Sequence, residues 1–450
     1  MRSAGCGAWF ALAGLLSAAE PAAVIAISAD RAGAVYACGE EARLEIAVRD
    51  GRGALLTTGR VAVTVDNFGT NGLFAATVEL ARQNPVVWRG TLRQPGFLRC
   101  GAKAAGGLTA KAAVYGVGFD PEGIRLGSGG PPDDFDAYWR GEIERLEREV
   151  PPEPRVERVA AHSTAERDAF RVSFATFGGK RVYGFLTVPT ESARGPFPLR
   201  ITVPWAGPGA CAPEQRPGEE GVMTLVLNVH DYEPGPDAAA NRKKYDAQNR
   251  RYAEEVKGIK LRSAYENHRY AGYADRTTYF YHDALLGIRR GVLWALARPD
   301  ADRTRVGYVG RSQGGGIGLM LVALTPGVTR ALFCQPAFAD LLACRQGRSA
   351  GWPCLVERAR PADRAAVERA AAYYDAGHFA SRLTCDVRVI IGFADDTCPP
   401  PGVYAAYSEI RAPKTILHDV GVPHSDCPSY HQNQSWALEA PAGTTQKAAK

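Results

Sequence analysis

The stretch RVGYVGRSQGGGIGLMLVAL, residues 305–324, constrains the fold of this chain more than any other. A short apolar run typical of a buried strand comes first, and an apolar segment of helical length follows the glycines. Between them Ser312 stands in the pattern G-x-S-x-G, flanked by Gly310 and Gly314. Because a side chain presented on a sharp strand-to-helix turn leaves no room for Cβ atoms beside it, glycines are needed there. The stretch predicts a strand, a tight turn that exposes one hydroxyl, and a helix.

Strand and helix patterns alternate on both sides of this turn, from residue 118 to residue 450. Such alternation is typical of a mostly parallel sheet with helices on its faces, and a serine on such a turn favours the α/β-hydrolase fold. Buried-strand runs include LRITVPW, MTLVLNVH, RALFCQP, VRVIIGF and KTILHDV. Helices are predicted at residues 134–150, 279–298, 313–324, 361–376 and 403–411.

Residues 20–117 have a different character, with short alternating runs broken by Gly, Asn, Asp or Pro at roughly ten-residue spacing. This pattern predicts a small immunoglobulin-like β-sandwich that precedes the larger domain, with GSGGPPDD between them. Phe68, Phe74 and Trp88 could stack on sugar rings, but such aromatic residues more often fill a core.

The first residues combine a positive charge at Arg2 with a short apolar stretch and small residues before Ala19. This arrangement is typical of an export signal spanning residues 1–19, so we expect a periplasmic or secreted protein. No later segment is apolar enough for a membrane anchor, so no membrane partner is expected.

Ten cysteines are present, nine of them after the expected cleavage. An oxidising compartment makes disulfides plausible, and buried thiols are an equal alternative for each pair. The pairs considered are Cys38–Cys100, Cys344–Cys354 and Cys398–Cys427.

The net charge of +6 is spread along the chain, with hydrophobic residues at 46% and charged residues at 23%. The basic run at 241–251 also contains acidic and amide residues, so a solvated loop or helix face is favoured over a nucleic-acid site. We therefore expect a globular protein without a nucleic-acid partner.

A nucleophilic Ser312 would need a base and an acid, which follow the serine in that fold in the order acid, then histidine. Two acids, Asp395 and Asp396, come directly after a buried strand. His424 lies in the loop after the next strand, and it is the histidine that combines this order with the C-terminal edge of the sheet. Solvent-exposed side chains or a helix cap are the alternative roles for these residues.

An oxyanion hole should contain two N–H donors. The first candidate is the backbone N–H of Gln313, directly after the serine. The second should come from the loop VPWAGPG, where Ala206 or Gly207 can donate because the neighbouring prolines have no N–H. This chemistry requires no cofactor and no metal.

Several of these motifs resemble the acetyl xylan esterase and cephalosporin-C deacetylase family, carbohydrate esterase family seven of the α/β-hydrolase superfamily. The resemblance spans roughly residues 130–440 and rests on DDFDAYW, GGKRVYGFLTVP, the segment through GRSQGGG, and GFADDTCPP. It implies Ser312 as nucleophile, Asp395 as acid and His424 as base. Better-known members are implied to be ring-like hexamers without a leading β-sandwich, which leaves a homo-oligomer open here.

The chain departs from that family pattern in two places near the serine. Arg311 stands where the family usually has glycine, and Trp205-Ala206-Gly207 replaces an H-G-Y segment. The function expected is that of a secreted serine esterase that removes acetyl or other small acyl groups from xylan or related carbohydrates. The alternatives are a prolyl-oligopeptidase-type peptidase, whose β domain would be a larger repeat propeller, and a non-catalytic carbohydrate-binding protein.

Overall fold

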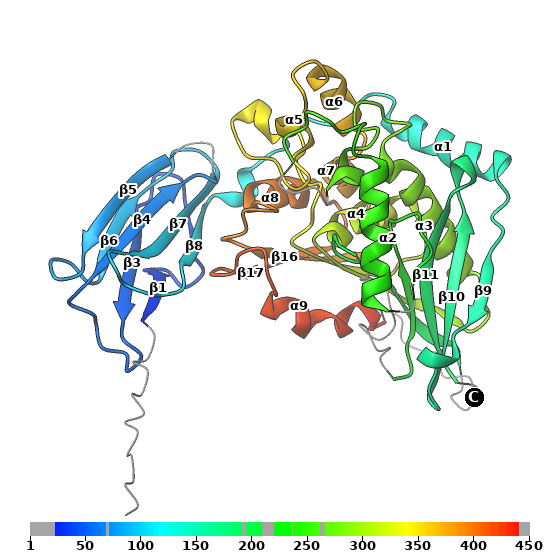
Figure 1. The fold of residues 1–450 in the computed structure, drawn as a ribbon, viewed down its shortest axis with the longest axis horizontal. Coiled ribbons are helices and arrows are strands. Elements are labelled where there is room, and N and C mark those ends of the chain that lie inside the picture. The colour runs from blue at the N-terminus through cyan, green and yellow to red at the C-terminus, as the bar shows by residue number, and fades with distance from the viewer. Residues whose placement is uncertain are drawn as a thin grey trace, which may run out of the picture.

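The computed structural model describes residues 23–68, 72–190, 195–208, 220–235, 237–261 and 266–440. Its N-terminal part contains two sheets, drawn in blue in Figure 1. Val61, Val63 and Val65 of one strand are fully buried while the residues between them are not, which is the alternation of a sheet with one covered face. The first sheet has the order β1 (Val24–Ala29), β3 (Ala42–Arg49), β6 (Val86–Gly90), and the second has the order β2 (Val35–Tyr36), β8 (Ala113–Phe119), β7 (Gly96–Ala105), β4 (Arg60–Asp66), β5 (Gly72–Glu79).

The C-terminal part is built on one nine-stranded sheet. From β13 to β17 neighbouring strands run parallel, whereas β9, β10 and β11 join that half antiparallel. The predicted mostly parallel sheet with a preceding small β domain is confirmed. The strand order is β17 (Lys414–Asp419), β16 (Asp386–Gly392), β15 (Arg330–Cys334), β14 (Ala301–Arg311), β12 (Phe197–Thr202), β13 (Met223–Leu227), β11 (Arg181–Pro189), β10 (Arg167–Ala175), β9 (Arg155–Arg158).

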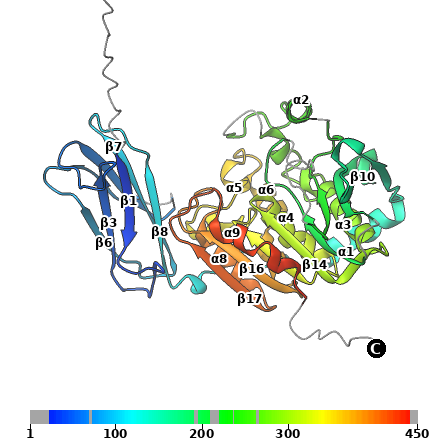
Figure 2. The ribbon, with the colours of Figure 1, turned by 90° about the horizontal axis from the view of Figure 1, so that it is seen from below.

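Helices cover both faces of this sheet (Figures 1 and 2). α3 (Phe280–Leu296), α4 (Gln313–Leu324) and α8 (Pro400–Glu409) pack against its strands, and the short turn Ser435–Leu438 packs against β12, β14 and β15. The remaining described helices are α1 (Phe135–Glu149), α2 (Ala238–Arg251), α5 (Leu355–Arg358), α6 (Arg364–Ala371), α7 (Ala376–Ala380) and α9 (Pro428–Asn433).

One local prediction needs correction and one is confirmed. The helix expected at 361–376 is split, because the Asp375 side chain accepts the Gly377 N–H and starts α7 as a new helix. The basic run 241–251 is a solvated helix face as expected, because all its arginine and lysine side chains are exposed. It forms most of α2, and the Asn241, Tyr245 and Asn249 side chains are buried beneath that helix.

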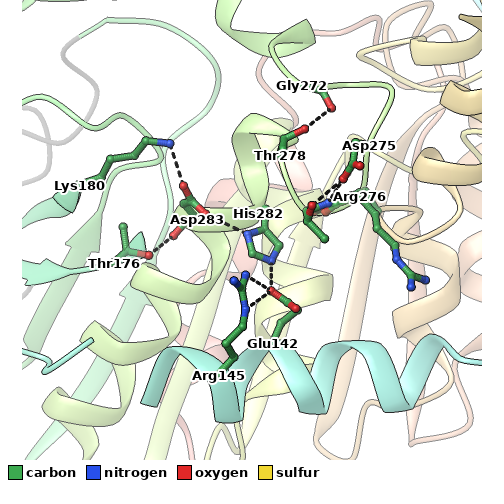
Figure 3. Close-up of polar contacts among 12 residues, drawn as sticks. Glu142, Arg145, Thr176, Lys180, Gly272, Asp275, Arg276, Thr278, His282 and Asp283 are labelled. Carbon is green, nitrogen blue, oxygen red and sulfur yellow. Dashed lines mark hydrogen bonds and ion pairs between the residues drawn. The ribbon is translucent and has the colours of Figure 1, made fainter. Parts of the chain in front are cut away.

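The entry helix α1 is fixed to α3 through a buried histidine (Figure 3). The two ring nitrogens of His282 each lie 2.9 Å from a carboxylate oxygen, one of Glu142 on α1 and one of Asp283 on α3. Asp283 also accepts a hydrogen bond from Lys180 at 2.8 Å, which connects the turn between β10 and β11 to α3. The DDFDAYW segment thus ends in a helix that is anchored to the sheet through α3.

All eight described cysteines are free thiols, so the three disulfides considered from the sequence are wrong. The pairs were Cys38–Cys100, Cys344–Cys354 and Cys398–Cys427. Cys38 lies in a turn where its N–H bonds Asp120, while Cys100 is buried inside β7. The thiol of Cys427 instead lies beside Cys334 in a small apolar cluster. Cys6, Cys211 and the expected signal 1–19 fall outside the described residues.

No helix in the described ranges is long and apolar enough to cross a membrane.

Candidate active site

Ser312 lies on a strained turn between β14 and α4. Its φ is +56° and its ψ is −122°, a conformation that residues with a Cβ rarely adopt. The turn is held by the Ser312 N–H, which donates to the Cys334 carbonyl at 2.9 Å. The Ser312 carbonyl accepts from Gly316 and Ala337 at 3.0 Å each. These backbone hydrogen bonds therefore hold the turn that presents the Ser312 side chain.

Gly314 lets this turn lie directly on the end of β12. A Cβ built on Gly314 would be 1.9 Å from the Val203 carbonyl oxygen, so no side chain fits there. The Gly314 carbonyl in turn accepts a 2.5 Å hydrogen bond from the hydroxyl of Tyr308 on β14. The second glycine of the motif is thus required for close approach.

The side chains of Ser312, His424 and Asp395 form a hydrogen-bonded chain. The Ser312 Oγ lies 2.9 Å from His424 Nε2, and His424 Nδ1 lies 2.8 Å from Asp395 Oδ2. Asp395 is fully buried, and its other carboxylate oxygen accepts the N–H groups of Thr397 and Cys398 at 2.8 Å each. A buried carboxylate with these partners can hold an imidazole in one tautomer and orientation.

Three parallel strands of one sheet, with β15 between the first two, bring these residues together from distant positions in the sequence. Ser312 follows β14, Asp395 follows β16 and His424 follows β17, all at the carboxyl edge of the sheet. The two later loops are joined, because Ala394 donates its N–H to the Val422 carbonyl at 3.2 Å. Asp396, the other acid of the sequence motif, points elsewhere and forms an ion pair with Arg99.

The segments that carry the expected oxyanion donors also meet at this turn. Gln313 is the first residue of α4, so its N–H has no partner within the helix. Its side chain donates to the Pro204 carbonyl at 3.3 Å, which ties the helix start to the loop of Ala206 and Gly207. Gly207 has a φ of +150°, a conformation that favours glycine.

The sequence did not reveal that a buried aromatic cluster supports this loop. His230 Nε2 lies 3.3 Å from the Gly207 carbonyl oxygen, and its ring contacts Tyr232, Tyr245 and His268. Burial lowers the pKa of His230 to about 4, so the ring is neutral at pH 7. Neutral Nε2–H can donate to that carbonyl. The segment NVHDYEPG carries the signal, since it places a histidine directly after a buried strand.

Arg311 and Trp205, where the chain departs from the family pattern, are neighbours beside the serine. The Arg311 guanidinium lies 5.8 Å from the centre of the Trp205 ring and 2.6 Å from a carboxylate oxygen of Asp426. Trp205 is 41% exposed, unusual for a large apolar side chain. Together these side chains form a partly apolar, partly charged surface next to Ser312.

Asp395, Cys398 and His424 present atoms within 4.8 Å of one another, a spacing that a metal ion could use. The Asp395 carboxylate and His424 Nδ1 are already joined to each other by a hydrogen bond. Burial raises the pKa of the Cys398 thiol well above its usual range, which disfavours the thiolate that a metal would need. The geometry fits a proton relay better than a metal centre.

Comparisons with known proteins show the family and the fold of this chain. The acetyl xylan esterase (AXE1) family profile matches residues 127–439. The acetyl esterase Axe7A of Xylanibacter ruminicola is 28% identical over 344 residues, which cover 76% of this chain and 73% of that protein.

Two solved structures share the fold. The acetyl xylan esterase from Paenibacillus sp. R4 has a TM-score of 0.56 at 21% identity, covering 68% of this chain and 94% of its own. Acetyl xylan esterase 1 from Thermoanaerobacterium sp. JW/SL YS485 has a TM-score of 0.54 at 20% identity, covering 71% of this chain and 96% of its own. The family match spans more than half of the chain and includes all three side chains of the hydrogen-bonded set. The chain therefore belongs to the acetyl xylan esterase family, carbohydrate esterase family seven, and is a carboxylic ester hydrolase.

Proposed function

We propose that this protein is a serine esterase that removes acetyl groups from xylan or related carbohydrate esters through a covalent acyl-enzyme. The observation that carries the proposal is the continuous hydrogen-bonded chain from Ser312 through His424 to buried Asp395. Nucleophile, base and orienting acid are the three groups that such a mechanism needs.

In the first half of the reaction, His424 Nε2 takes the proton of Ser312 while Oγ attacks the ester carbonyl carbon. The resulting tetrahedral oxyanion would be stabilised by the Gln313 N–H and by a second donor from Ala206 or Gly207. The imidazolium then gives its proton to the sugar oxygen as the bond between that oxygen and the carbonyl carbon breaks, which leaves an acetyl group covalently bound to Ser312 Oγ. In the second half, His424 Nε2 takes a proton from water, whose oxygen attacks the acetyl carbonyl carbon. The bond between that carbon and Ser312 Oγ then breaks, His424 returns the proton to Oγ, and acetate leaves.

Asp395 has an orienting role in this scheme. Because its other oxygen is held by the Thr397 and Cys398 N–H groups, the carboxylate cannot turn away from His424 Nδ1. It stabilises the imidazolium formed in each half-reaction without accepting its proton.

The substrate and location are further parts of the proposal. The matching family is that of the acetyl xylan esterases, which supports an acetylated carbohydrate as substrate. The basic start and short apolar stretch of residues 1–19 support export to the periplasm or the exterior, where polymeric xylan is accessible. A homo-oligomer is compatible with this activity.

Hydrolysis of p-nitrophenyl acetate and acetate release from acetylated xylan test the proposal. We expect Ser312→Ala to lower kcat by about 10⁶-fold, and Asp395→Asn to lower it by about 10⁴-fold. Ser408→Ala, at a partly exposed position on α8, is the matched control and should keep wild-type activity. Undiminished hydrolysis by Ser312→Ala would exclude the mechanism. Cleavage of p-nitrophenyl acetate without acetate release from xylan would exclude only acetylated xylan as the substrate.

A further inference from the structure

We propose that the N-terminal β-sandwich positions the catalytic acid, so that it is part of the esterase active site rather than a separately acting module. This inference rests on the proposed function, since it assigns Asp395 its role. Residues of β7 and β8 contact the loop from Phe393 to Cys398, the acid loop, which carries Asp395.

The closest contact is between backbone atoms. A Cβ built on Gly116 of β8 would lie 2.0 Å from the carbonyl oxygen of Phe393. Phe393 directly follows β16 and stands two residues before Asp395. The sandwich therefore lies against the start of the acid loop with no space for even a methyl group between them.

Aromatic side chains extend this contact. Phe97 of β7 packs edge-on against Phe393, with ring centres 5.0 Å apart, and also contacts Tyr404 of α8 at 5.6 Å. All three side chains are at most 2% exposed, and the buried apolar residues of both parts belong to one connected core. Sharing a core ties the positions of the two parts together more firmly than a flexible linker would.

An ion pair lies next to the catalytic acid itself. Arg99 of β7 lies 3.4 Å from a carboxylate oxygen of Asp396, the residue after Asp395. Arg99 is fixed on the sandwich side by Asp66 at 3.1 Å. Asp396 is 64% exposed, so the pair is partly screened and should add less than the buried contacts do.

The histidine loop is also in reach of the sandwich. A Cβ built on Gly421, three residues before His424, would lie 3.8 Å from the Tyr115 ring of β8. Figure 2 shows β8 on the side of the sandwich that faces α8 and β17. Strands β7 and β8 thus support, from outside the sheet, both loops that orient the imidazole toward Ser312.

The main test is Gly116→Val, with Gly72→Val as the matched control. Gly72 lies in β5 of the same sandwich and has open space where a Cβ would be. We expect Gly116→Val to lower kcat for p-nitrophenyl acetate at least tenfold with KM within twofold of wild type. Fluorophosphonate labelling of Ser312 should slow by a similar factor, and Gly72→Val should leave both unchanged. A wild-type chain that neither hydrolyses the ester nor reacts with the label would instead contradict the proposed function.

A milder pair of variants covers the case in which Gly116→Val does not fold. Asp396→Ala removes the ion pair at the acid loop, and Glu41→Ala removes the exposed Arg89–Glu41 pair elsewhere on the sandwich. We expect a two- to fivefold loss of kcat and an altered acid limb of the pH profile for Asp396→Ala only. The inference would be overturned if Asp396→Ala kept the wild-type kcat and pH profile and Gly116→Val, where it folds, kept the wild-type kcat.

Discussion

Arg311 and Asp426 form an ion pair with 2.6 Å between their charged groups, and this pair joins the residue before Ser312 to the residue two positions after His424. The Asp426 side chain is 79% exposed, so solvent screens the interaction. We expect Asp426→Asn to change the free energy of unfolding by less than about 1 kcal/mol and kcat by less than about fivefold. Urea unfolding and steady-state kinetics measure both, and a loss near that of Ser312→Ala would show that the pair has a catalytic role.

Gly314→Ala should remove most of the activity. The added methyl group would lie 1.9 Å from the Val203 carbonyl oxygen, which must move together with the loop of Ala206 and Gly207. Overpacking of this kind costs about 1–3 kcal/mol of stability, and we expect kcat to fall at least about 100-fold as the donors shift.

Gly141→Ala in α1 is the control for this substitution. That glycine has open space at the Cβ position and lies inside a helix. The change should raise stability by about 0.5–1 kcal/mol and leave kcat unaltered. Thermal unfolding followed by circular dichroism distinguishes the two variants, and equal activity in both would contradict the role of Gly314.

Stability should decline on acidification because of buried His230. Its pKa falls from 6.5 to about 4 on folding, so between these values the unfolded chain binds more protons. The stabilisation is complete above pH 6.5 and is lost as the pH falls towards 4, in total about 3 kcal/mol. Burial lowers the pKa of neighbouring His268 as well, which adds in the same direction.

Urea unfolding at pH 7 and pH 5 tests this dependence. His230→Phe should show a smaller loss between the two pH values than the wild type. His431→Gln, at a position where the side chain is 60% exposed, should keep the wild-type slope. A wild-type slope in His230→Phe would show that other groups carry the dependence.

Thiol titration under denaturing, non-reducing conditions should give at least eight free cysteines per chain. Every cysteine in the described ranges is a free thiol, and five are buried. Blocking accessible thiols before unfolding should leave most of the signal intact. Fewer than eight free thiols would mean that at least one of these residues forms a disulfide in the isolated protein.

Local patterns in the sequence predict the elements but not the contacts between them. Strand, turn and helix around Ser312 are encoded within about twenty residues, so their periodicity is sufficient. Asp395 and Asp396 both follow the same strand, and local pattern cannot separate them. The family resemblance distinguishes them, and the structure shows why they differ: one carboxylate meets His424, the other Arg99, from distant parts of the chain.

The predictions that need correction also depend on side-chain contacts or on contacts between distant parts of the chain. The predicted helix at 361–376 ignored the ability of Asp375 to cap a second helix. The sequence does not determine which cysteines lie together, and in the structure Cys427 lies beside Cys334, whose carbonyl accepts the Ser312 N–H. The sequence shows that His230 follows a buried strand but not what it contacts, because its partner Gly207 lies in the loop after an earlier strand.

The order of strands in the large sheet has a consequence for how the protein folds during synthesis. β14, β15, β16 and β17 are neighbours in the sheet in the same order as in the chain, so each can add to its predecessor as it leaves the ribosome. β12 instead lies between β13 and β14, so its second edge stays open until residues beyond 300 have been made. We expect the loop of Ala206 and Gly207 to reach its final position only when β14 docks, which makes the hydrolytic site one of the last features to form.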